Sequence, residues 1–484
     1  MASSWLVLTI VAAYMVVLAL ISFWVRRSTQ SAKNFTTGGK DFPAVLIGFL
    51  MMSEFIGTTA SIGTAQAGYT YGISAAWNIA ALGVGFVIFS MLLAKKYKDL
   101  GENTISGALA RTYGEPVRFA TSVIMICALS IVAVSIYASG GAVLATLLGI
   151  ERTSAIIIVG IVSVLYVGIG GMRSVIYTNV LHAIMMYAGI VLALGFALSK
   201  IGGMGELVAR LPAPMFEVDN VGWPKIFAWL VAGIGATFAT QYVVQAVNTV
   251  SDGRKAQHAS FYCALMLIPY GLIAAMVGMC SAVLFPQIPS LQAFPQILGH
   301  MHEWMAGIVV AGLAGALFGT MAALTMGIAT LLLKDFYQPF FNPRGDDRKN
   351  LNFARTATIV AGLLPITLAL YASDVLVVTF LAKALRASLA VLVLMVFYAP
   401  TFGTRQGAFI SIIASLIITI GWFLMGNPYG IDNAYIALAT PLVIMTLSHL
   451  LRGGKPEHAD STRPVSAGSP GHAVPMIHTG IPSG

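Results

Sequence analysis

Long apolar runs, separated by short polar segments, dominate the pattern of residues along the chain. Most of these runs are at least as long as the roughly 20 residues that a helix needs to cross the hydrocarbon core of a bilayer. There are thirteen such runs, at about residues 4–25, 42–70, 73–94, 119–148, 154–172, 175–199, 226–250, 259–284, 305–333, 354–373, 375–398, 406–425 and 431–450. The pattern predicts an all-α polytopic membrane protein with about 13 transmembrane helices, and the longest runs predict tilted, kinked or broken helices.

The composition agrees with a chain that lies in a bilayer. Hydrophobic residues make up 58% of the 484 positions and charged residues only 9%, against roughly 25% charged residues in a soluble protein. So few charged side chains cannot cover a soluble surface. The three cysteines, Cys127, Cys263 and Cys280, each stand inside an apolar run, which excludes a disulfide scaffold and provides no metal-ligand spacing.

The net charge of +9 is explained by the distribution of Lys and Arg between the loops. With the N-terminus outside, the inner loops hold 21 basic residues, and the outer loops hold four, Arg152, Lys200, Arg210 and Lys225. Because cytoplasmic loops carry the excess of basic residues, we expect a cytoplasmic C-terminus in a plasma membrane, specifically a bacterial inner membrane. The basic charge then gives no reason to expect nucleic-acid binding. Residues 452–484, rich in Pro, Gly, Ser and His, predict a disordered cytoplasmic tail.

Two of the apolar runs contain small and polar residues in their interiors. One reads SEFIGTT at residues 53–59, and the other reads GIGATFATQ at residues 233–241. Such residues let a helix break and leave backbone carbonyls and amides free to bind an ion or a solute. They also allow helices to pack closely, which is the structural alternative. Because the two segments lie five spans apart, their spacing favours a transporter with inverted repeats.

Three motifs, taken in order, resemble a known family. The dipeptide NF at 34–35 is followed by GGK at 38–40; YVGIGG at 166–171 is followed by Thr178, Asn179 and His182; and ALFGT at 316–320 is followed by KDFY at 334–337. Over about residues 5–450 the chain resembles the sodium:solute symporter family, whose members have a LeuT-type fold.

The resemblance implies a 5+5 inverted repeat with discontinuous core helices. It divides the chain into a leading helix with the first cytoplasmic loop (1–41), a first five-helix repeat (42–200), an extracellular loop (201–225), a second five-helix repeat (226–398), two trailing helices (399–451) and the tail (452–484).

The resemblance also implies a sodium site at the first helix break. Its candidate ligands are Ser53 and Ile56 on one helix and Ala316, Gly319 and Thr320 on another. A small hard cation prefers several oxygen ligands, and a broken helix supplies oriented carbonyls. Three positions depart from many relatives: Gly319 replaces a serine, and Phe55 and Asn179 stand where some relatives carry aspartate. Each departure removes charge or oxygen near the cation, so proton coupling or uncoupled transport remains an alternative.

Three ionisable residues lie within the predicted spans. Glu54 is in the second span, and Lys383 and Arg386, three residues apart, share one face of the eleventh. A charge at this depth costs about 2.5–3.5 kcal/mol on insertion scales unless it faces a cavity or a partner. The resemblance implies that the second and eleventh spans lie side by side, so we expect a Glu54–Arg386 ion pair that forms a gate or helps to define the solute site. A permanent structural ion pair is the alternative. The second cation then remains to receive an anionic group, and Arg offers the bidentate geometry that carboxylates favour.

The sequence therefore predicts a secondary active symporter for a small organic solute, either a carboxylate or an amino acid, with sodium as coupling ion and no other cofactor. The candidate residues for solute binding or gating are Glu54, Gly57, Thr58, Thr240, Gln241, Lys383 and Arg386. Tryptophans 77, 223 and 229 are expected at the membrane interface, and an aromatic cage built from them keeps a quaternary amine such as choline or betaine as an alternative solute. A sensor, a channel or a membrane enzyme is disfavoured because the chain contains no output domain, no ring of pore charges and no catalytic constellation.

Overall fold

The computed structural model describes residues 4–26, 42–167, 171–372 and 375–452, and every regular element within these ranges is helical. The longer helices are α1 (Ser4–Arg26), α3 (Ala44–Phe55), α4 (Thr58–Tyr71), α5 (Trp77–Leu92), α8 (Glu115–Leu148), α9 (Arg152–Val167), α10 (Gly171–Ile201), α12 (Trp223–Phe238), α14 (Gly253–Leu284), α16 (Glu303–Leu331), α18 (Asp347–Ala369), α19 (Val375–Tyr398), α20 (Arg405–Leu424) and α21 (Asn433–Leu451). The short helices are α6 (Ala94–Leu100), α7 (Ile105–Tyr113), α11 (Met204–Arg210), α13 (Gln241–Asn248), α15 (Ala293–His300) and α17 (Gln338–Phe341). The motif at 34–40 and the predicted tail from residue 453 onwards lie outside the described ranges.

The all-α polytopic architecture predicted from the apolar runs is confirmed. Within the described residues, nine helices are long and apolar enough to cross a bilayer, or ten if the bent pair α12 and α13 counts as one span. Shorter apolar helices occur at Trp5–Ile21, Ala44–Phe55 and Arg152–Val164. The figure of 13 transmembrane helices therefore stays a prediction.

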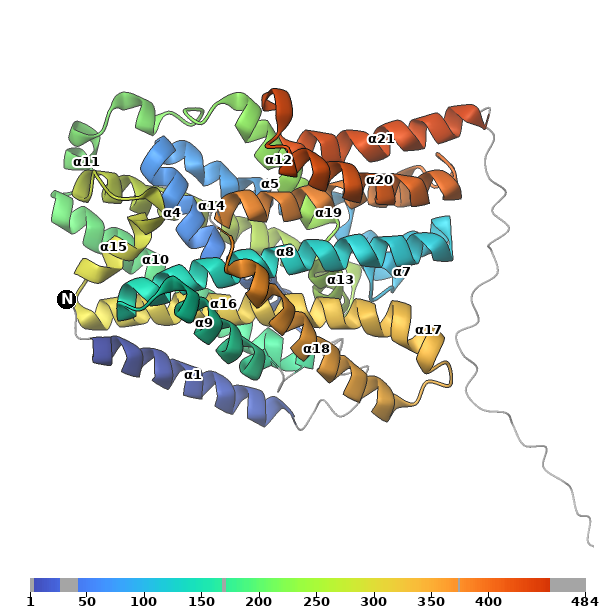
Figure 1. Ribbon diagram of the computed structural model, residues 1–484, viewed down its shortest axis with the longest axis horizontal. Coiled ribbons are helices and arrows are strands. Elements are labelled where there is room, and N and C mark those ends of the chain that lie inside the picture. Colours follow the sequence, from blue (N-terminus) through green and yellow to red (C-terminus); the bar gives the residue numbers. More distant parts are fainter. Residues whose placement is uncertain (1–3, 27–41, 168–170, 373–374, 453–484) are drawn as a thin grey trace, which may run out of the picture.

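Helix α16 lies between α1 and α8 in the view of Figure 1, and it packs mainly on α10, α1, α8 and α18. In the most apolar stretch of its span, 89% of residues are buried inside the protein, whereas the corresponding share for α21 is 22%. The outer helices instead turn large apolar side chains away from the protein, such as Leu364 of α18 and Leu424 of α20. Large exposed apolar surfaces of this kind are typical of a membrane interface.

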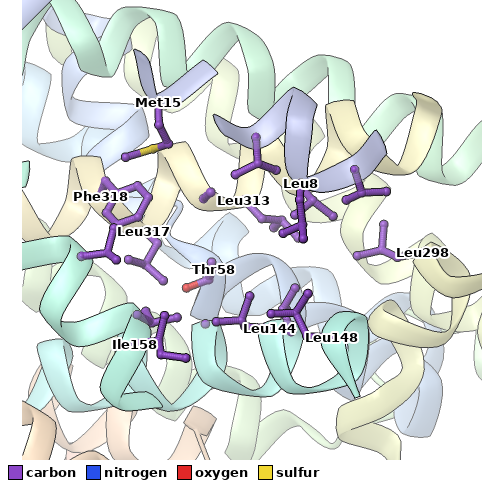
Figure 2. Close-up of a pocket in the computed structure, with 18 of the residues that line it drawn as sticks. Leu8, Met15, Thr58, Leu144, Leu148, Ile158, Leu298, Leu313, Leu317 and Phe318 are labelled. Carbon is purple, nitrogen blue, oxygen red and sulfur yellow. The ribbon is translucent and has the colours of Figure 1, made fainter. Parts of the chain in front are cut away.

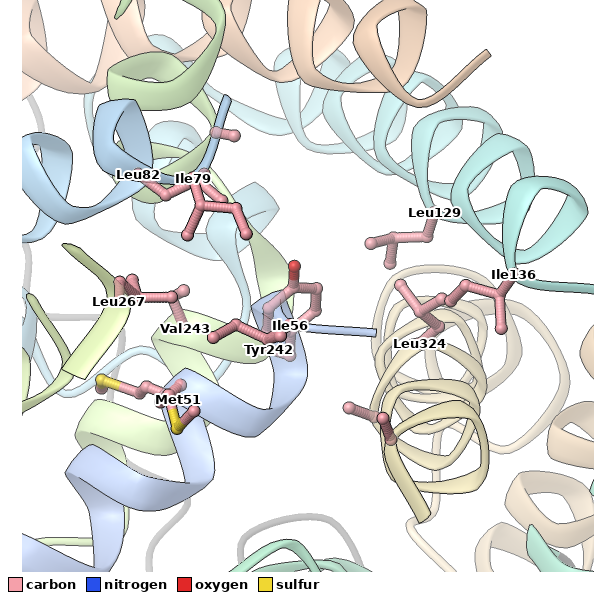
Figure 3. Close-up of a cluster of buried hydrophobic side chains, with 14 of the residues drawn as sticks. Met51, Ile56, Ile79, Leu82, Leu129, Ile136, Tyr242, Val243, Leu267 and Leu324 are labelled. Carbon is pink, nitrogen blue, oxygen red and sulfur yellow. The ribbon is translucent and has the colours of Figure 1, made fainter. Parts of the chain in front are cut away.

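A cluster of buried apolar side chains surrounds the end of α3 (Figure 3). Ile56 lies there beside Tyr242 of α13, with Leu82 of α5 and Ile136 of α8 on other sides. Helices from both predicted repeats thus meet at the point where α3 stops.

The apolar runs at 42–70 and 226–250, which contain the two breaks, also pack closely through their small residues, as the structural alternative expected. A Cβ atom on Gly68 of α4 would collide with the backbone of Ala275 in α14, and one on Gly235 of α12 would collide with Ala387 of α19. Small residues let membrane helices approach at their backbones. Packing and helix breaking therefore both occur in each run, at different positions.

A buried carboxylate ties α7 and α8 to the end of α16. Ser106 of α7 and Ser122 of α8 both donate hydrogen bonds to Asp335 Oδ2. Asp335 is 1% exposed and lies in a π-helical segment, Leu332–Tyr337. The acidic residue of the third sequence motif therefore has a structural role in joining three helices.

We expect Asp335→Ala to destabilise the protein, because two buried hydroxyl groups lose their acceptor. A hydrogen bond to a charged group contributes about 1.5–3 kcal/mol, so the loss should be about 3–6 kcal/mol. Asp335→Asn keeps one acceptor oxygen and should lose less. Thermal unfolding of the detergent-solubilised variants measures the difference, and equal losses in the two variants would show that the acceptor is not what stabilises this junction.

Candidate functional site

The first helix break lies between α3 and α4, at Ile56 and Gly57. Ile56 has φ −99° and ψ 75°, and Gly57 has ψ −178°, so neither residue continues the helix. Thr320 Oγ1 of α16 donates a hydrogen bond to the carbonyl oxygen of Ser53 at 3.3 Å. The break predicted within residues 53–59 is therefore present and lies against α16.

The second break lies between α12 and α13, at Ala239 and Thr240. Thr240 has an extended backbone, with φ −120° and ψ 131°, and the two helices meet at a bend of 45°. Thr240 Oγ1 donates to the carbonyl of Ala236 and accepts a hydrogen bond of 3.1 Å from Arg386 Nη1. This break was also predicted, within residues 233–241.

The candidate cation ligands are all buried, and three of them contact one another or a common neighbour. The carbonyl oxygen of Ser53 accepts a hydrogen bond from the Thr320 hydroxyl, and the Ser53 hydroxyl donates one to Asn179 Oδ1 at 2.7 Å. Gly319 faces the same Asn179. Ile56 lies at the break itself, and Ala316 is fully buried within α16.

The glycine at position 319 is explained by its neighbours on α10. A Cβ atom there would overlap Asn179 Oδ1 and would lie 2.7 Å from His182 Cδ2. His182 is held in turn by Tyr14 of α1, whose hydroxyl lies 2.6 Å from its Nδ1 atom. The space that a serine side chain would need at position 319 is thus occupied by the amide oxygen of Asn179 on α10.

A small cavity of about 40 Å³ lies beside the two breaks. It is lined by Glu54, Gly57, Thr320, Lys383 and Arg386, five residues singled out from the sequence. The cavity also borders Phe55 and Tyr242, whose rings pack edge to face 5.2 Å apart. The fold therefore brings one predicted ion ligand, Thr320, and four of the predicted solute residues to one place.

The expected Glu54–Arg386 ion pair is not formed. Arg386 donates to Thr240 Oγ1 and to the hydroxyl of Tyr242, at 3.1 and 3.2 Å, so its guanidinium is directed at the second break. Both carboxylate oxygens of Glu54 are buried and have no hydrogen-bond partner among the described residues. The prediction was wrong because the guanidinium donates to the hydroxyl of Tyr242 on α13 and to that of Thr240, the residue just before α13, and not to the carboxylate on α3.

Lys383 is also held without a carboxylate. Its Nζ atom donates to Asn78 Oδ1 at 3.1 Å and lies 4.5 Å from the centroid of the Phe380 ring. Lys383 and Arg386 are 6% and 2% exposed. Among the residues that the structure describes, neither cation forms an ion pair with an acidic side chain. The cavity is therefore bordered by two buried basic side chains whose hydrogen-bond partners are neutral, and by the carboxylate of Glu54.

Two of the predicted solute residues point elsewhere. Gln241 accepts a hydrogen bond from the backbone N–H of Ile105 and donates to the carbonyl of Asn103, which fastens the start of α7 to α13. Thr58 is hydrogen bonded to Ser139 of α8 at 2.9 Å and borders a different, apolar cavity. Their amide and hydroxyl groups are therefore used in joining helices in this conformation.

The three tryptophans do not surround the small cavity, as far as the described residues show. Trp229 is 3% exposed and stacks on Phe380, with ring centroids 5.5 Å apart, so its ring packs inside the protein. Trp77 donates to the carbonyl of Val218, and Trp223 is 49% exposed. The aromatic cage required for a quaternary amine is not assembled from these residues.

Two residues at the site were missed by the sequence reasoning. Asn78 supplies the acceptor for Lys383, and Ser139 is hydrogen bonded to Thr58 and Thr59. Both are polar residues inside apolar runs. That signal was present in the sequence but is common among residues that only join helices.

Solved structures of coupled transporters have this fold. A sodium-coupled sialic acid symporter in a substrate-bound outward-open state aligns with a TM-score of 0.79 and 16% identity, over 92% of this chain and 98% of that one. Mhp1, a nucleobase-cation-symport-1 family transporter, aligns in its closed conformation with a TM-score of 0.58 and 16% identity, over 86% and 95% of the two chains. MhsT in complex with L-phenylalanine aligns with a TM-score of 0.56 and 14% identity, over 84% and 98%. The chain therefore has the LeuT-type fold, in which two core helices are broken.

The sequence comparison identifies the family within that class. The model of the sodium:solute symporter family matches residues 35–415, and the chain belongs to this family. The sodium/glucose cotransporter of Vibrio parahaemolyticus is 22% identical over 488 residues, covering 91% of this chain and 90% of that protein. The resemblance inferred from the three motifs is confirmed.

Proposed function

We propose that the protein couples the inward movement of sodium to the uptake of a small carboxylate or amino acid. The observation that carries this proposal is the pair of buried cations, Lys383 and Arg386, which border a cavity between the breaks and have only neutral partners. A buried charge is costly unless it is paired. The Glu54 carboxylate borders the same cavity and offsets one of these charges. An anionic group on the solute would offset the other, and the guanidinium can bind a carboxylate through two parallel hydrogen bonds.

Uptake into proteoliposomes tests the proposal directly. Radiolabelled monocarboxylates, amino acids and quaternary amines are supplied under an inward gradient of sodium, of potassium or of protons. We expect accumulation of a carboxylate or an amino acid that requires the sodium gradient and collapses when an ionophore dissipates it. A preference for quaternary amines would contradict the solute class. Accumulation driven by the proton gradient alone would favour proton coupling instead, with the unpartnered Glu54 as the group to change next.

We propose that sodium is bound between the first break and α16. The hydroxyl of Thr320 already donates a hydrogen bond to the carbonyl oxygen of Ser53. If that hydroxyl turns its proton away, both oxygens can bind one cation between them. The Asn179 side chain supplies a further oxygen beside Gly319. Oxygen ligands from α3, α10 and α16 suit a small hard cation.

We expect Thr320→Ala to raise the sodium concentration that half-saturates uptake by about tenfold, which corresponds to about 1.4 kcal/mol of binding free energy. The variant removes one oxygen ligand and leaves the solute residues in place. Thr325→Ala is the matched control, since Thr325 is also buried in α16 but donates its hydroxyl to the carbonyls of Met321 and Ala322 on its own helix. Unchanged half-saturation by sodium in the Thr320 variant would remove this hydroxyl from the site.

We propose that transport occurs by alternating access, which the same arrangement supports. The pairs α3–α4 and α12–α13 each begin one of the proposed repeats, 42–200 and 226–398, and inverted repeats place broken helices at matching positions. Sodium and solute must each favour the same conformation for their movements to be coupled. The proposed orientation, with the N-terminus outside and the C-terminus in the cytoplasm of a bacterial inner membrane, rests on the basic residues of the loops.

A further inference from the structure

A second cavity, of about 290 Å³, lies between α1 on one side and α8, α9 and α16 on the other (Figure 2). Its lining is aliphatic almost throughout, with side chains such as Leu144, Leu313 and Leu317 pointing into the common space. Thr58 contributes the one hydroxyl group in the lining. That hydroxyl is already hydrogen bonded to Ser139.

The chemistry of this lining excludes water and polar solutes as occupants. A buried water requires two to four polar partners, whereas apolar cavities remain dry and take up apolar molecules. The cavity is about twice as large as the ~150 Å³ apolar cavity that accommodates benzene. Its size therefore suits a chain of several methylene groups.

The surroundings of the cavity indicate where an apolar chain would come from. Helix α1 packs on α16 and α10 but makes no extensive contact with α9 within the described residues. Along α9, Ile158 and Val162 line the cavity and are still 45% and 39% exposed, next to the exposed side chains of Ile157 and Ile161. The cavity wall thus continues into an apolar outer surface, which in a membrane protein faces lipid.

We propose that this cavity binds one acyl chain of a bilayer lipid, which enters between α1 and α9 and reaches Thr58. Thr58 is the first residue of α4, so the end of the chain contacts the helix that begins at the first break. Gly57 and Thr59, on either side of Thr58, border the small cavity instead. The first turn of α4 therefore separates the lipid chain from the proposed solute site, and the lipid site does not depend on which solute is carried.

Photolabelling of the full chain in vesicles tests this site. The vesicles contain phosphatidylethanolamine and phosphatidylglycerol with a trace of phosphatidylethanolamine that carries a diazirine at the end of one acyl chain. After irradiation, mass spectrometry maps the label on the protein. We expect label on α1, on α9 and on the first turn of α4. As the fraction of labelled lipid is raised, we expect the α4 label to reach a plateau while the label on the outer surfaces continues to rise. Label confined to the outer surfaces, or α4 label that does not saturate, would overturn the proposal.

Two variants that fill the cavity give a second readout. Leu144→Trp and Leu313→Trp each place an indole in the space that the acyl chain would occupy, and either should abolish the α4 label. Ile417→Trp is the matched control, because Ile417 of α20 is 65% exposed and lies outside the cavity lining. Full α4 labelling in a filled variant that unfolds at the wild-type temperature would overturn the proposal. If both variants misfold, the saturation of the wild-type label still decides between the two outcomes.

Discussion

Uptake by the Arg386→Ala variant is expected to fall by about 30-fold or more. Truncating one partner of a buried, hydrogen-bonded charge pair costs at least about 2 kcal/mol, and each 1.36 kcal/mol corresponds to tenfold. The variant removes the guanidinium that would bind the solute carboxylate, and it leaves the hydroxyls of Thr240 and Tyr242 without their donor. The measurement is the initial rate of sodium-driven uptake against solute concentration.

Two further variants separate charge from geometry and from general effects. Arg386→Lys keeps the positive charge but loses the planar pair of donors, so its uptake should lie between wild type and Arg386→Ala. Arg210→Ala removes an exposed arginine that pairs with Glu206, and surface pairs of this kind contribute little, so its uptake should be unchanged. An Arg386→Ala protein that transports within about twofold of wild type would exclude Arg386 from the solute site, since the loss would be under about 0.5 kcal/mol.

The second large effect is expected for Gly319→Ser, the change that would introduce the hydroxyl found in many relatives. Because the new Cβ would overlap Asn179 Oδ1, that side chain must move and break its hydrogen bond to Ser53. Overpacking costs about 1–3 kcal/mol, and the lost hydrogen bond about 1 kcal/mol more. We expect a lower unfolding temperature and weaker sodium binding, even though a potential ligand has been added.

A double-mutant cycle identifies the cause. In the Asn179→Ala background the serine has room, so the two changes should be coupled by about 0.5–3 kcal/mol of stability. Gly195→Ser on α10 is the control, because a Cβ atom there meets no atom within 4 Å. If the losses of stability in the two single variants simply add in the double variant, contact with Asn179 is not the reason that residue 319 is a glycine.

The breaks and the charged cavity were predictable because their signals lie close together along the chain. A run of small and polar residues within an apolar span predicts a break, as at Gly57 and Thr240, and the three-residue spacing of Lys383 and Arg386 places both on one face of α19. The second inference needs only the period of a helix. The family resemblance then indicated a cation site at the first break.

Hydrogen-bond partners were not predictable in the same way. Arg386 is 146 positions from Thr240, and Lys383 is 305 positions from Asn78, so packing of whole helices determines which side chains meet. Opposite charge alone suggested Glu54 as the partner of Arg386, but two hydroxyls lie within reach of the guanidinium and satisfy it. Similarly, nothing in the sequence around Gln241 indicated that its amide would cap α7.

The attachment of α7 has a consequence for the kinetics of the conformational change. Gln241 and Asn248, at the two ends of α13, both bind the segment that leads into α7, and Asn248 donates to the carbonyl of Glu102. At its other side, α7 is bound through Ser106 to the end of α16. A tilt of α13 away from α16 must therefore carry α7 with it or break three hydrogen bonds at once, of which the one from the Ile105 N–H is fully buried. Because these bonds would break together, we expect opening at this end to depend steeply on temperature.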